Sequence, residues 1–564
     1  MKIKQHKKLK FNTSVKFNMV AIFLIILFCI AISPVTLQND TFYTIKIGEH
    51  ITNYGIDMKD PFSWHEGLDY TYPHWLYDLL TYIVYSTFGF MGIYVATVIL
   101  ACLLGIIIYR VNCKISKSNI VSFFVTIGVM YLLKDFIAAR AQLVTFIFFA
   151  LTIYFIESFL KNKKLKYAIG LIIIPILIAN LHCAVWPFYF ILYLPYIAEY
   201  VVAVVADRII YKKSLIKILK KKIAKLSNNN DKKEKLEELK QKLKRLEEKV
   251  ERIKIKRKQE LKNPYKIYLK RNENAKWLII IMIICIFTGL LTPLGNTPYT
   301  YLLKTMQGNT TQNISEHLPM TLIEQVPALC TIVIFLSILT FTKTRIKLAD
   351  LFMLGGLSLL MLNSRRQLSM LAIICSFILS KLIVELLREY EPGIIKKMSK
   401  KIVSRIGAIV LILMVSLLSY YFAKDKANEA IIDESTYPVQ ACNYIINNID
   451  LGTAKFYNEY NYGSYMLFRN IPVFIDSRAD LYAPEFSGLE NDIFMDFIEV
   501  SNISVFYEEI FEKYEMTHII TYKNSKINMI ITQSNDEKYK EIYSDEDFII
   551  YERLSTNMEE YNWK

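Results

Sequence analysis

The chain has 564 residues, 53 % of them apolar, and a positive mean hydropathy. Many apolar runs reach the roughly 17–25 residues that a spanning helix needs, so the composition excludes a soluble globular protein and predicts a polytopic α-helical membrane protein. The net charge of +16 does not indicate a nucleic-acid partner, because it is divided between segments of opposite sign. Residues 207–275 contain 25 Lys and Arg against 10 Asp and Glu, whereas residues 424–564 contain 12 against 26. We therefore expect these segments on opposite sides of a membrane.

A basic segment, MKIKQHKKLK, precedes the first apolar run at 17–35. This pattern is typical of a signal peptide or of an uncleaved first helix. The length of the run and the lack of a small-residue cleavage site after it favour the uncleaved helix. The positive-inside rule then places the N-terminus in the cytoplasm and the loop 39–78 outside.

The loop 39–78 is unusually rich in groups that take or give a proton. These groups are Asp40, Glu49, His50, Asp57, Asp60, His65, Glu66, His74 and Asp78. Helix-like spacing of apolar residues predicts an interfacial helix over Thr41–Asn53, and the short aromatic run Trp75–Phe88 predicts a second one. We expect this loop to be the catalytic loop of a membrane enzyme.

Ten further apolar runs predict spanning helices after this loop. They lie at about 91–109, 119–134, 141–160, 167–183, 184–206, 276–292, 325–342, 348–363, 367–387 and 404–423. With the first helix, about eleven transmembrane helices form an N-terminal membrane half (1–206) and a C-terminal membrane half (276–423). The loops then expected in the cytoplasm are all basic, and the odd number of spans places the tail 424–564 outside.

The basic insert 207–275 separates the two membrane halves. Leucine-type residues at 236, 239, 243, 246, 250 and 253 repeat in steps of three and four, which is a coiled-coil seam. A preceding basic helix at 208–226 and a turn at 227–231 predict a cytoplasmic helical hairpin about 30 Å long, at about 1.5 Å per residue. The hairpin fits a charged spacer that touches anionic lipid, or a surface for a partner or a second copy.

The tail 424–564 has no membrane-length apolar run. Candidate helices at 436–449 and 487–513 alternate with candidate strands at 454–458, 472–476, 518–522 and 548–553, which predicts a C-terminal extracytoplasmic α/β domain. Asp476, Arg478 and Asp480 alternate on a strand-like segment and would share one face. They fit either a surface that binds a substrate or an internal salt-bridge cluster.

Adjacent arginines at 365 and 366 lie in an outer turn in this topology, against the positive-inside pattern. A planar guanidinium suits two oxygens of a phosphate. Arg365 and Arg366, together with Arg140, are therefore candidates for holding a lipid-linked phosphate. The alternative is that the pair extends to lipid headgroups.

Other polar residues of the outer loops also have two interpretations. Lys134 fits a phosphate ligand or a boundary lysine, and His182 fits a ligand or a helix cap. Asp40 fits a catalytic group or the N-cap of the helix that follows it. Glu316 is a candidate for binding a substrate.

The eight cysteines do not predict disulfides, because only Cys442 lies in the tail and the other seven lie in or beside apolar runs. The sequence has no CxxC or HExxH motif, so no metal site is assigned. The carboxylate-rich loop does not exclude a divalent metal, and the cofactor is unknown.

The order of several short motifs resembles that of prokaryotic membrane proteins of the GT-C glycosyltransferase superfamily. Asp40-Thr41-Phe42-Tyr43 is followed by Gly48, by DPFSW at 60–64 and by HWL at 74–76. Similar family segments follow at NLH (180–182), at TPLG (292–295) with Glu316, at the arginine turn 365–366, in the Gly-Tyr and D-x-R-x-D-x-Y elements of 457–482, and at 543–553. The resemblance touches both ends and most outer loops, but not the insert.

The resemblance implies a GT-C-like fold and inverting transfer of a sugar from a polyprenyl phosphate. The acceptor would be a glycan, a lipid or a protein, and the reaction would take place at the outer face of a prokaryotic plasma membrane. Such a transfer needs a base for the acceptor hydroxyl, cations for the leaving phosphate, and a negative field near the oxocarbenium-like transition state.

These needs assign a role to each candidate residue. We expect Asp40 to be the catalytic base, with Glu49 or Asp60 in support. Phosphate binding is assigned to Arg140, Arg365 and Arg366, supported by His182 and Lys134, and orientation of the acceptor to Glu316.

The alternative is a non-catalytic membrane scaffold or a lipid-linked glycan handling protein with the same fold. In that case the polar turns are structural, and the tail and insert recruit partners. A transporter is disfavoured, because the sequence has no internal repeat and its unusual polar residues lie at one face.

Overall fold

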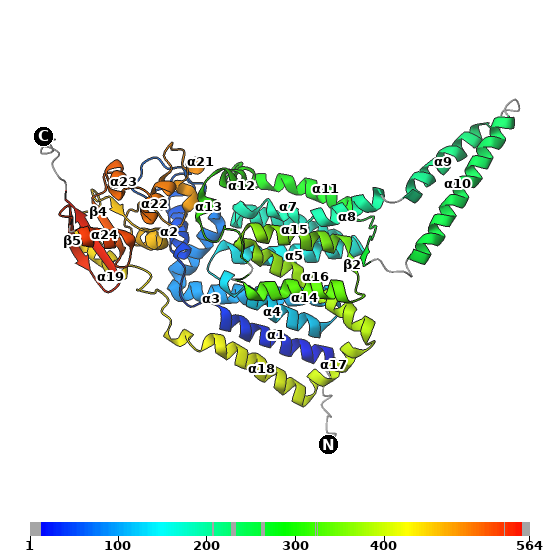
Figure 1. Ribbon diagram of the computed structural model, residues 1–564, viewed down its shortest axis with the longest axis horizontal. Coiled ribbons are helices and arrows are strands. Elements are labelled where there is room, and N and C mark those ends of the chain that lie inside the picture. The colour runs from blue at the N-terminus through cyan, green and yellow to red at the C-terminus, as the bar shows by residue number, and fades with distance from the viewer. Residues whose placement is uncertain are drawn as a thin grey trace, which may run out of the picture.

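The structure is a computed structural model, and it describes residues 13–205, 208–226, 233–260, 266–321, 323, 325–534 and 536–554. A helical bundle forms its middle, with a part that contains a β-sheet at one end and a long helical hairpin at the other (Figure 1). The basic residues 1–12 and the predicted turn at 227–231 lie outside the described residues.

Within the described residues, six helical segments are long and apolar enough to cross a membrane. They are α1 (Thr13–Ile32), α3 (Trp75–Ser116), α5 (Ala141–Asn162), the run Cys183–Val205 with α7 (Phe188–Ile191) and α8 (Leu194–Val205), α16 (Leu368–Tyr390) and α18 (Arg405–Ala423). The chain is therefore a helical membrane protein.

Five shorter apolar helices complete the bundle. They are α4 (Asn119–Leu132), α6 (Leu165–Leu181), α11 (Ala275–Ile286), α14 (Val326–Phe341) and α15 (Leu348–Asn363). An apolar helix thus lies at each of the predicted span positions. Because these five are short for a bilayer, the number of eleven spans stays a prediction.

The bundle has a central helix and a peripheral one. In the apolar stretch of α16, 67 % of the residues are buried inside the protein, whereas in that of α18 the share is 17 %. Helix α18 therefore presents most of its surface to the outside. In the interior, the Ser380 hydroxyl donates a hydrogen bond to Asn112 Oδ1 over 2.8 Å and links α16 to α3. This bond satisfies polar groups that would be costly to bury alone.

Two helical segments frame the end of the bundle nearest the sheet. The predicted helix in the loop 39–78 is confirmed as α2 (Asn39–Tyr54), which crosses that end in Figure 1. The predicted helix Trp75–Phe88 is confirmed as a helix: it forms the first part of α3, which consists of two helices joined across a kink at Gly89. Gly89 interrupts α3 with a φ of 62°, a left-handed conformation that glycine adopts easily, so the helix bends there.

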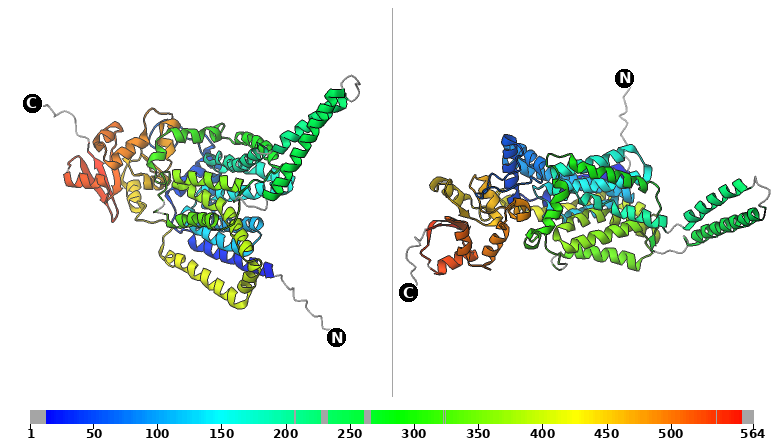
Figure 2. Two further views of the ribbon diagram at one scale, coloured as in Figure 1. Left: turned by 45° about the vertical axis from the view of Figure 1, so that its right-hand side comes forward. Right: turned by 90° about the horizontal axis from the view of Figure 1, so that it is seen from above.

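The predicted hairpin is confirmed as α9 (Arg208–Leu226) packed against α10 (Lys233–Glu260), and it projects away from the bundle (Figure 2). The heptad residues of α10 are less exposed than their neighbours. With 28 residues, α10 is about 42 Å long, which exceeds the predicted length. At the base of the hairpin, β1 (Ile267–Tyr268) pairs in parallel with β2 (Ile346–Lys347).

The C-terminal part contains a four-stranded sheet with the order β3-β4-β6-β5. Its strands are β3 (Phe456–Tyr457), β4 (His518–Tyr522), β5 (Tyr539–Ser544) and β6 (Phe548–Arg553). The helices around it are α19 (Val439–Asn448), α20 (Tyr460–Phe468), α21 (Pro484–Ser487), α22 (Ile493–Asn502), α23 (Tyr507–Lys513) and α24 (Lys526–Ser534). The predicted strands at 454–458, 518–522 and 548–553 are confirmed, and β5, α20 and α24 are additional.

Two predictions for this part are wrong. Residues 472–476 form no sheet strand, because their backbone bonds elsewhere: Phe474 N donates to Asn458 Oδ1 over 2.8 Å, and Trp64 N donates to the Val473 carbonyl over 3.3 Å. The predicted helix 487–513 is divided into two helices, α22 and α23, with Ile503 at a φ of 57° after α22.

The C-terminal part packs directly on the loop 39–78. The Phe42 ring of α2 lies 5.0 Å from Tyr437 and 5.1 Å from Tyr465, measured between ring centroids. The loop is therefore enclosed between the bundle on one side and the C-terminal part on the other.

Close contact between α2 and α3 at Gly48 gives a prediction for stability. A Cβ at Gly48 would lie 2.2 Å from the Asp78 carbonyl oxygen, so Gly48→Ala must push the helices apart. We expect a loss of about 1–3 kcal/mol of stability, measured as a lower midpoint of thermal unfolding in nanodiscs.

Gly128→Ala in α4 is the matched control, because a Cβ there meets nothing within 4 Å. Alanine in a helix interior should raise stability slightly. Equal unfolding midpoints for the two variants would contradict the close packing of α2 on α3.

Candidate functional site

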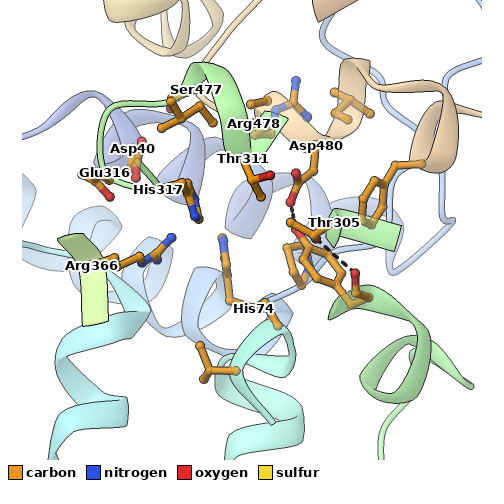
Figure 3. Close-up of a pocket in the computed structure, with 18 of the residues that line it drawn as sticks. Asp40, His74, Thr305, Thr311, Glu316, His317, Arg366, Ser477, Arg478 and Asp480 are labelled. Atoms are coloured by element: carbon orange, nitrogen blue, oxygen red, sulfur yellow. Dashed lines mark hydrogen bonds between the residues drawn. The ribbon is translucent and has the colours of Figure 1, made fainter. Parts of the chain in front are cut away.

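A cavity of about 490 Å³ lies where the loop 39–78, the end of the bundle and the C-terminal part meet. Its size is in the range of small-molecule sites. The labelled side chains of Figure 3 come from all three regions of the chain. Asp40 and His74 come from the loop, Arg366 from the bundle, and Arg478 and Asp480 from the C-terminal part.

One wall of the cavity holds an ion-pair network centred on Arg140. Arg140 Nε lies 2.8 Å from Asp40 Oδ2, and Arg140 Nη1 donates to Glu316 Oε1 over 3.0 Å. Burial alone would lower the pKa of Arg140, but the two carboxylates raise it above its usual range. The three predicted residues are therefore brought together as one ion-pair network, in which two carboxylates flank one guanidinium.

Asp40 does not cap α2. The N-cap position is Gln38, whose side chain makes no capping bond, and Asp40 lies in the first helical turn. An acidic side chain there is stabilised by the positive end of the helix dipole. The helix thus positions the carboxylate while leaving it at the cavity wall.

The adjacent arginines diverge in the 3-10 turn Arg365–Gln367 (η5). Arg366 lines the cavity, and in Figure 3 its guanidinium points toward His74 and His317. Arg365 does not line it; its Nε donates to the Pro319 carbonyl over 3.4 Å. Among the residues that the structure describes, no carboxylate forms an ion pair with Arg366, so its charge is available to an anion.

Three histidines border the same corner of the cavity. His74 Nδ1 lies 2.7 Å from Asp78 Oδ1, and its Nε2 lies 3.2 Å from the Tyr43 hydroxyl. Burial alone would lower the pKa of His74, but the Asp78 carboxylate raises it above its usual value. Burial and the charge of Arg366 lower the pKa of His317 to about 4. The Asp78 carboxylate thus stabilises the cation of His74, whereas His317 is neutral near neutral pH.

His182 lines the cavity as a buried residue of its wall. Its Nδ1 lies 3.0 Å from the Thr145 hydroxyl, and the residue is buried at the end of α6. Burial and the charge of Arg366 hold the pKa of His182 well below its usual value. His182 is therefore a neutral part of the cavity wall.

The C-terminal part contributes the wall around Asp480. The Tyr301 hydroxyl donates to Asp480 Oδ2 over 2.6 Å, and the Thr310 hydroxyl donates to Asp480 Oδ1 over 3.1 Å. Tyr301 lies in α12 (Thr297–Gln307) and Thr310 in α13 (Thr310–Asn313). Burial raises the pKa of Asp480, and these bonds reverse only part of that rise.

Asp476 and Arg478 do not share a face with Asp480, as a strand would require. Arg478 Nη2 lies 2.7 Å from Asp476 Oδ2, and Arg478 Nη1 lies 2.6 Å from Asp60 Oδ1. Asp480 instead lies in the 3-10 helix Ala479–Tyr482 (η7), so its side chain does not follow the alternation of a strand. The salt-bridge interpretation thus describes Asp476 and Arg478, and a site interpretation describes Asp480.

Four predicted site residues do not line the cavity, and we remove them from the site. Asp60 is buried in its ion pair with Arg478, and Arg365 bonds to a carbonyl. Glu49 pairs with Lys46 on the outer side of α2, and Lys134 pairs with Asp135 next to it in the chain. Their charges are already engaged, so the composition of the loops alone could not separate them from the cavity residues.

Two cavity residues were missed in the site predicted from the sequence. His74 has a signal, because Asp78 follows four residues later and a helix brings such a pair together. Asp480 has a weaker signal, because its alternation with Arg478 resembles a strand. Across the described residues, no group of three or more His, Cys, Asp or Glu is arranged to hold a metal ion.

No protein-family model matches the chain, and no curated protein matches it. The function must therefore be inferred from the chemistry of the cavity.

The raised pKa of His74 predicts how stability depends on pH. A raised folded-state pKa means that the contribution of His74 is full below its unfolded pKa of about 6.5 and is lost as pH rises through the folded value. We expect the stability advantage of the wild type over His74→Gln to be full below about pH 6.5 and to shrink as the pH rises above it. Thermal unfolding as a function of pH measures it.

His317→Gln provides the contrast. With a pKa of about 4, His317 is neutral in the folded state and becomes unfavourable only when the unfolded chain gains a proton at lower pH. Its variant should show no loss of advantage at alkaline pH. Parallel alkaline curves for the two variants would refute the His74–Asp78 cation.

Proposed function

We propose that the protein is a membrane glycosyltransferase that moves a sugar from a polyprenyl phosphate to an acceptor at the outer face of a plasma membrane. The observation that carries this proposal is the cavity, which combines an arginine without an ion-pair partner among the described residues, several carboxylates and an apolar rim. This combination fits an amphiphilic substrate with a phosphate, a polar sugar and a hydrocarbon chain.

The apolar rim supports a lipid-linked donor. Val185, Phe188, Leu302, Met306 and Ile314 line this side of the cavity. Leu303 and Met306 of α12 are 62 % and 72 % exposed, so the outer face of this helix offers apolar surface next to the cavity. A polyprenyl chain can leave the cavity over this surface into the bilayer.

The corner formed by Arg366 and His74 supports phosphate binding. Arg366 has a guanidinium that suits two phosphate oxygens, and His74, paired with Asp78, borders the same corner. As the bond between sugar and phosphate breaks, negative charge grows on the phosphate. Cations held in place at that point stabilise the transition state.

The Asp40–Arg140–Glu316 network supports stabilisation of the sugar in the same step. An oxocarbenium-like transition state carries positive charge and favours a fixed carboxylate nearby. Arg140 holds both carboxylates of the network in place. We assign to Asp40 this electrostatic role at the cavity wall.

The charge distribution supports the orientation of the protein in the membrane. The basic hairpin lies at the end of the bundle away from the cavity (Figure 1). The positive-inside rule places that end in the cytoplasm and the cavity outside. A prokaryotic plasma membrane is the setting that the resemblance to GT-C proteins implies.

A non-catalytic scaffold is the second candidate. The observation in its favour is that Asp40, Arg140 and Glu316 form an ion-pair network without a ligand. The open charge of Arg366 favours the transferase, because a purely structural arginine at a cavity would be expected to have a carboxylate partner.

Adjacent arginines allow a sharp test of the phosphate corner. Arg366→Ala should weaken binding of a polyprenyl phosphate by about 10–100-fold, because a hydrogen bond to a charged group is worth about 1.5–3 kcal/mol. Arg365→Ala, one residue away but outside the cavity, should bind nearly as the wild type does. Binding is measured with the full chain in nanodiscs and a short-chain polyprenyl phosphate.

Equal binding by both variants would remove Arg366 from the site. Failure of the wild type to bind the polyprenyl phosphate would contradict the transferase and favour the scaffold.

Two carboxylates of α2 allow a test of the catalytic role. Asp40→Asn should lower the turnover of a polyprenyl-phosphate sugar by about 10²–10³-fold, because a fixed charge is lost at the transition state. Glu49→Gln removes a carboxylate from the same helix outside the cavity and should keep normal turnover. Radiolabelled sugar transfer from a panel of polyprenyl-phosphate hexoses is the measurement, and normal turnover of Asp40→Asn would sink the assignment.

A further inference from the structure

We propose that the C-terminal part supplies the acceptor subsite of the cavity, that Asp480 takes the proton of the attacking hydroxyl, and that the acceptor is a saccharide. This inference rests on the proposed transferase function and names the acceptor that the cavity fits. It differs from the sequence-based assignment, which gave the base to Asp40.

The position of Asp480 supports its role. Its carboxylate lines the cavity and is held from behind by the Tyr301 and Thr310 hydroxyls, one on each oxygen. Each carboxylate oxygen has a second lone pair that can accept a further hydrogen bond. Asp480 is thus fixed in orientation but still able to accept a proton from a ligand hydroxyl.

Arg366 and Asp480 enter the cavity from different sides. In Figure 3, Arg366 comes from the bundle side on the left, and Asp480 comes from the C-terminal part on the upper right. No ion pair joins these two described residues, although the charge of Arg366 acts on Asp480. An inverting transfer needs the attacking hydroxyl on the face of the sugar opposite the leaving phosphate. A phosphate at Arg366 and a base at Asp480 satisfy this need.

Asp40 is less suited to the same task. One of its oxygens lies 2.8 Å from Arg140, which also binds Glu316. In Figure 3, Asp40 and Glu316 lie on the same side of the cavity as Arg366. A base on that side would be next to the leaving phosphate rather than opposite it.

Several hydroxyl groups and aromatic rings surround Asp480. In Figure 3, Thr305 and Thr311 lie beside Asp480, and both line the cavity. The rings of Tyr301 and Phe486 pack with their centroids 4.9 Å apart, and both residues line the cavity. Such a wall offers hydrogen bonds for several hydroxyls and an apolar surface for the C–H face of a sugar ring.

A saccharide brings several hydroxyls, whereas a serine or threonine of a peptide brings one, and a site built for hydroxyls rejects ligands that leave its groups unpaired.

The transfer step balances in this arrangement. The hydroxyl oxygen of the acceptor forms a bond to the anomeric carbon of the donor sugar as its proton passes to an Asp480 oxygen. The bond between the anomeric carbon and the phosphate oxygen breaks, and the phosphate leaves with the electron pair beside Arg366. Asp480 then returns the proton to water.

Two binding measurements and one transfer assay test this inference on the full chain in nanodiscs. The probes are maltotriose, chitotriose and mannotriose by saturation-transfer NMR, a capped Thr-Ser-Thr peptide as the competing acceptor class, and a short-chain polyprenyl phosphate. Asp480→Asn should weaken binding of the preferred trisaccharide about tenfold and lower sugar transfer about 10²–10⁴-fold, while polyprenyl phosphate binding stays unchanged.

Asp496→Asn is the matched control, because Asp496 also accepts a bond from a tyrosine hydroxyl, that of Tyr514, but lies away from the cavity. It should behave as the wild type in all three assays. If Asp480→Asn does not fold, Thr310→Val decides: it removes one of the two hydroxyls that hold Asp480 and should weaken trisaccharide binding several-fold.

The outcomes separate this inference from the proposed function. Polyprenyl phosphate binding that depends on Arg366, with trisaccharide binding that does not depend on Asp480, overturns the acceptor subsite alone. Binding of the peptide in preference to every trisaccharide also overturns it. No polyprenyl phosphate binding at all overturns the transferase and this inference with it.

Discussion

The walls of the cavity depend on the buried ion pairs of Arg478. This guanidinium, 418 residues away from Asp60 in the chain, joins Asp60 of the loop 39–78 to Asp476 of the C-terminal part. Its side chain is 3 % exposed, and both carboxylates are fully buried. Removing three charges from water costs free energy, so the buried side chains are stable only when each charge has a partner. This pairing requires one specific arrangement of Asp60, Asp476 and Arg478. The loop and the C-terminal part are thereby held as two walls of one cavity.

Within those walls the charges are divided between a closed set and an open set. Arg140 is neutralised by Asp40 and Glu316, and Arg478 is neutralised by Asp60 and Asp476. Arg366 and Asp480 have no such partner of opposite charge among the described residues. A charged group at a cavity without an ion-pair partner is able to bind a ligand group of complementary charge or hydrogen-bonding character. The two groups of ion pairs thus stabilise the walls of the cavity. Arg366 and Asp480 have no ion-pair partner in the part of the chain that the structure describes, and for this reason we place the reacting atoms between them.

The sequence predicted the helices of the bundle and the hairpin, because apolar length and heptad spacing are local signals. It also brought Asp40, Arg140 and Glu316 into one hypothesis, although Arg140 and Glu316 are 176 residues apart. It could not distinguish Arg366 from Arg365, because neighbours in a 3-10 turn point about 120° apart and only the fold decides which one faces the cavity. It misread 472–480 as a strand, since alternation also arises where an extended segment bonds to a side chain such as Asn458.

The position of the cavity offers different routes of approach to the two substrates that we propose. The exposed apolar face of α12 borders one side, which suits a substrate that arrives from the bilayer. Asp480 borders the side built by the C-terminal part, which is acidic overall and has no membrane-length apolar run, so an acceptor reaches it from water. α12 takes part in both sides, because it carries Met306 on the apolar rim and Tyr301 behind Asp480. A lipid chain seated on α12 would therefore fix the helix that orients Asp480, and donor binding would prepare the acceptor side for the reaction.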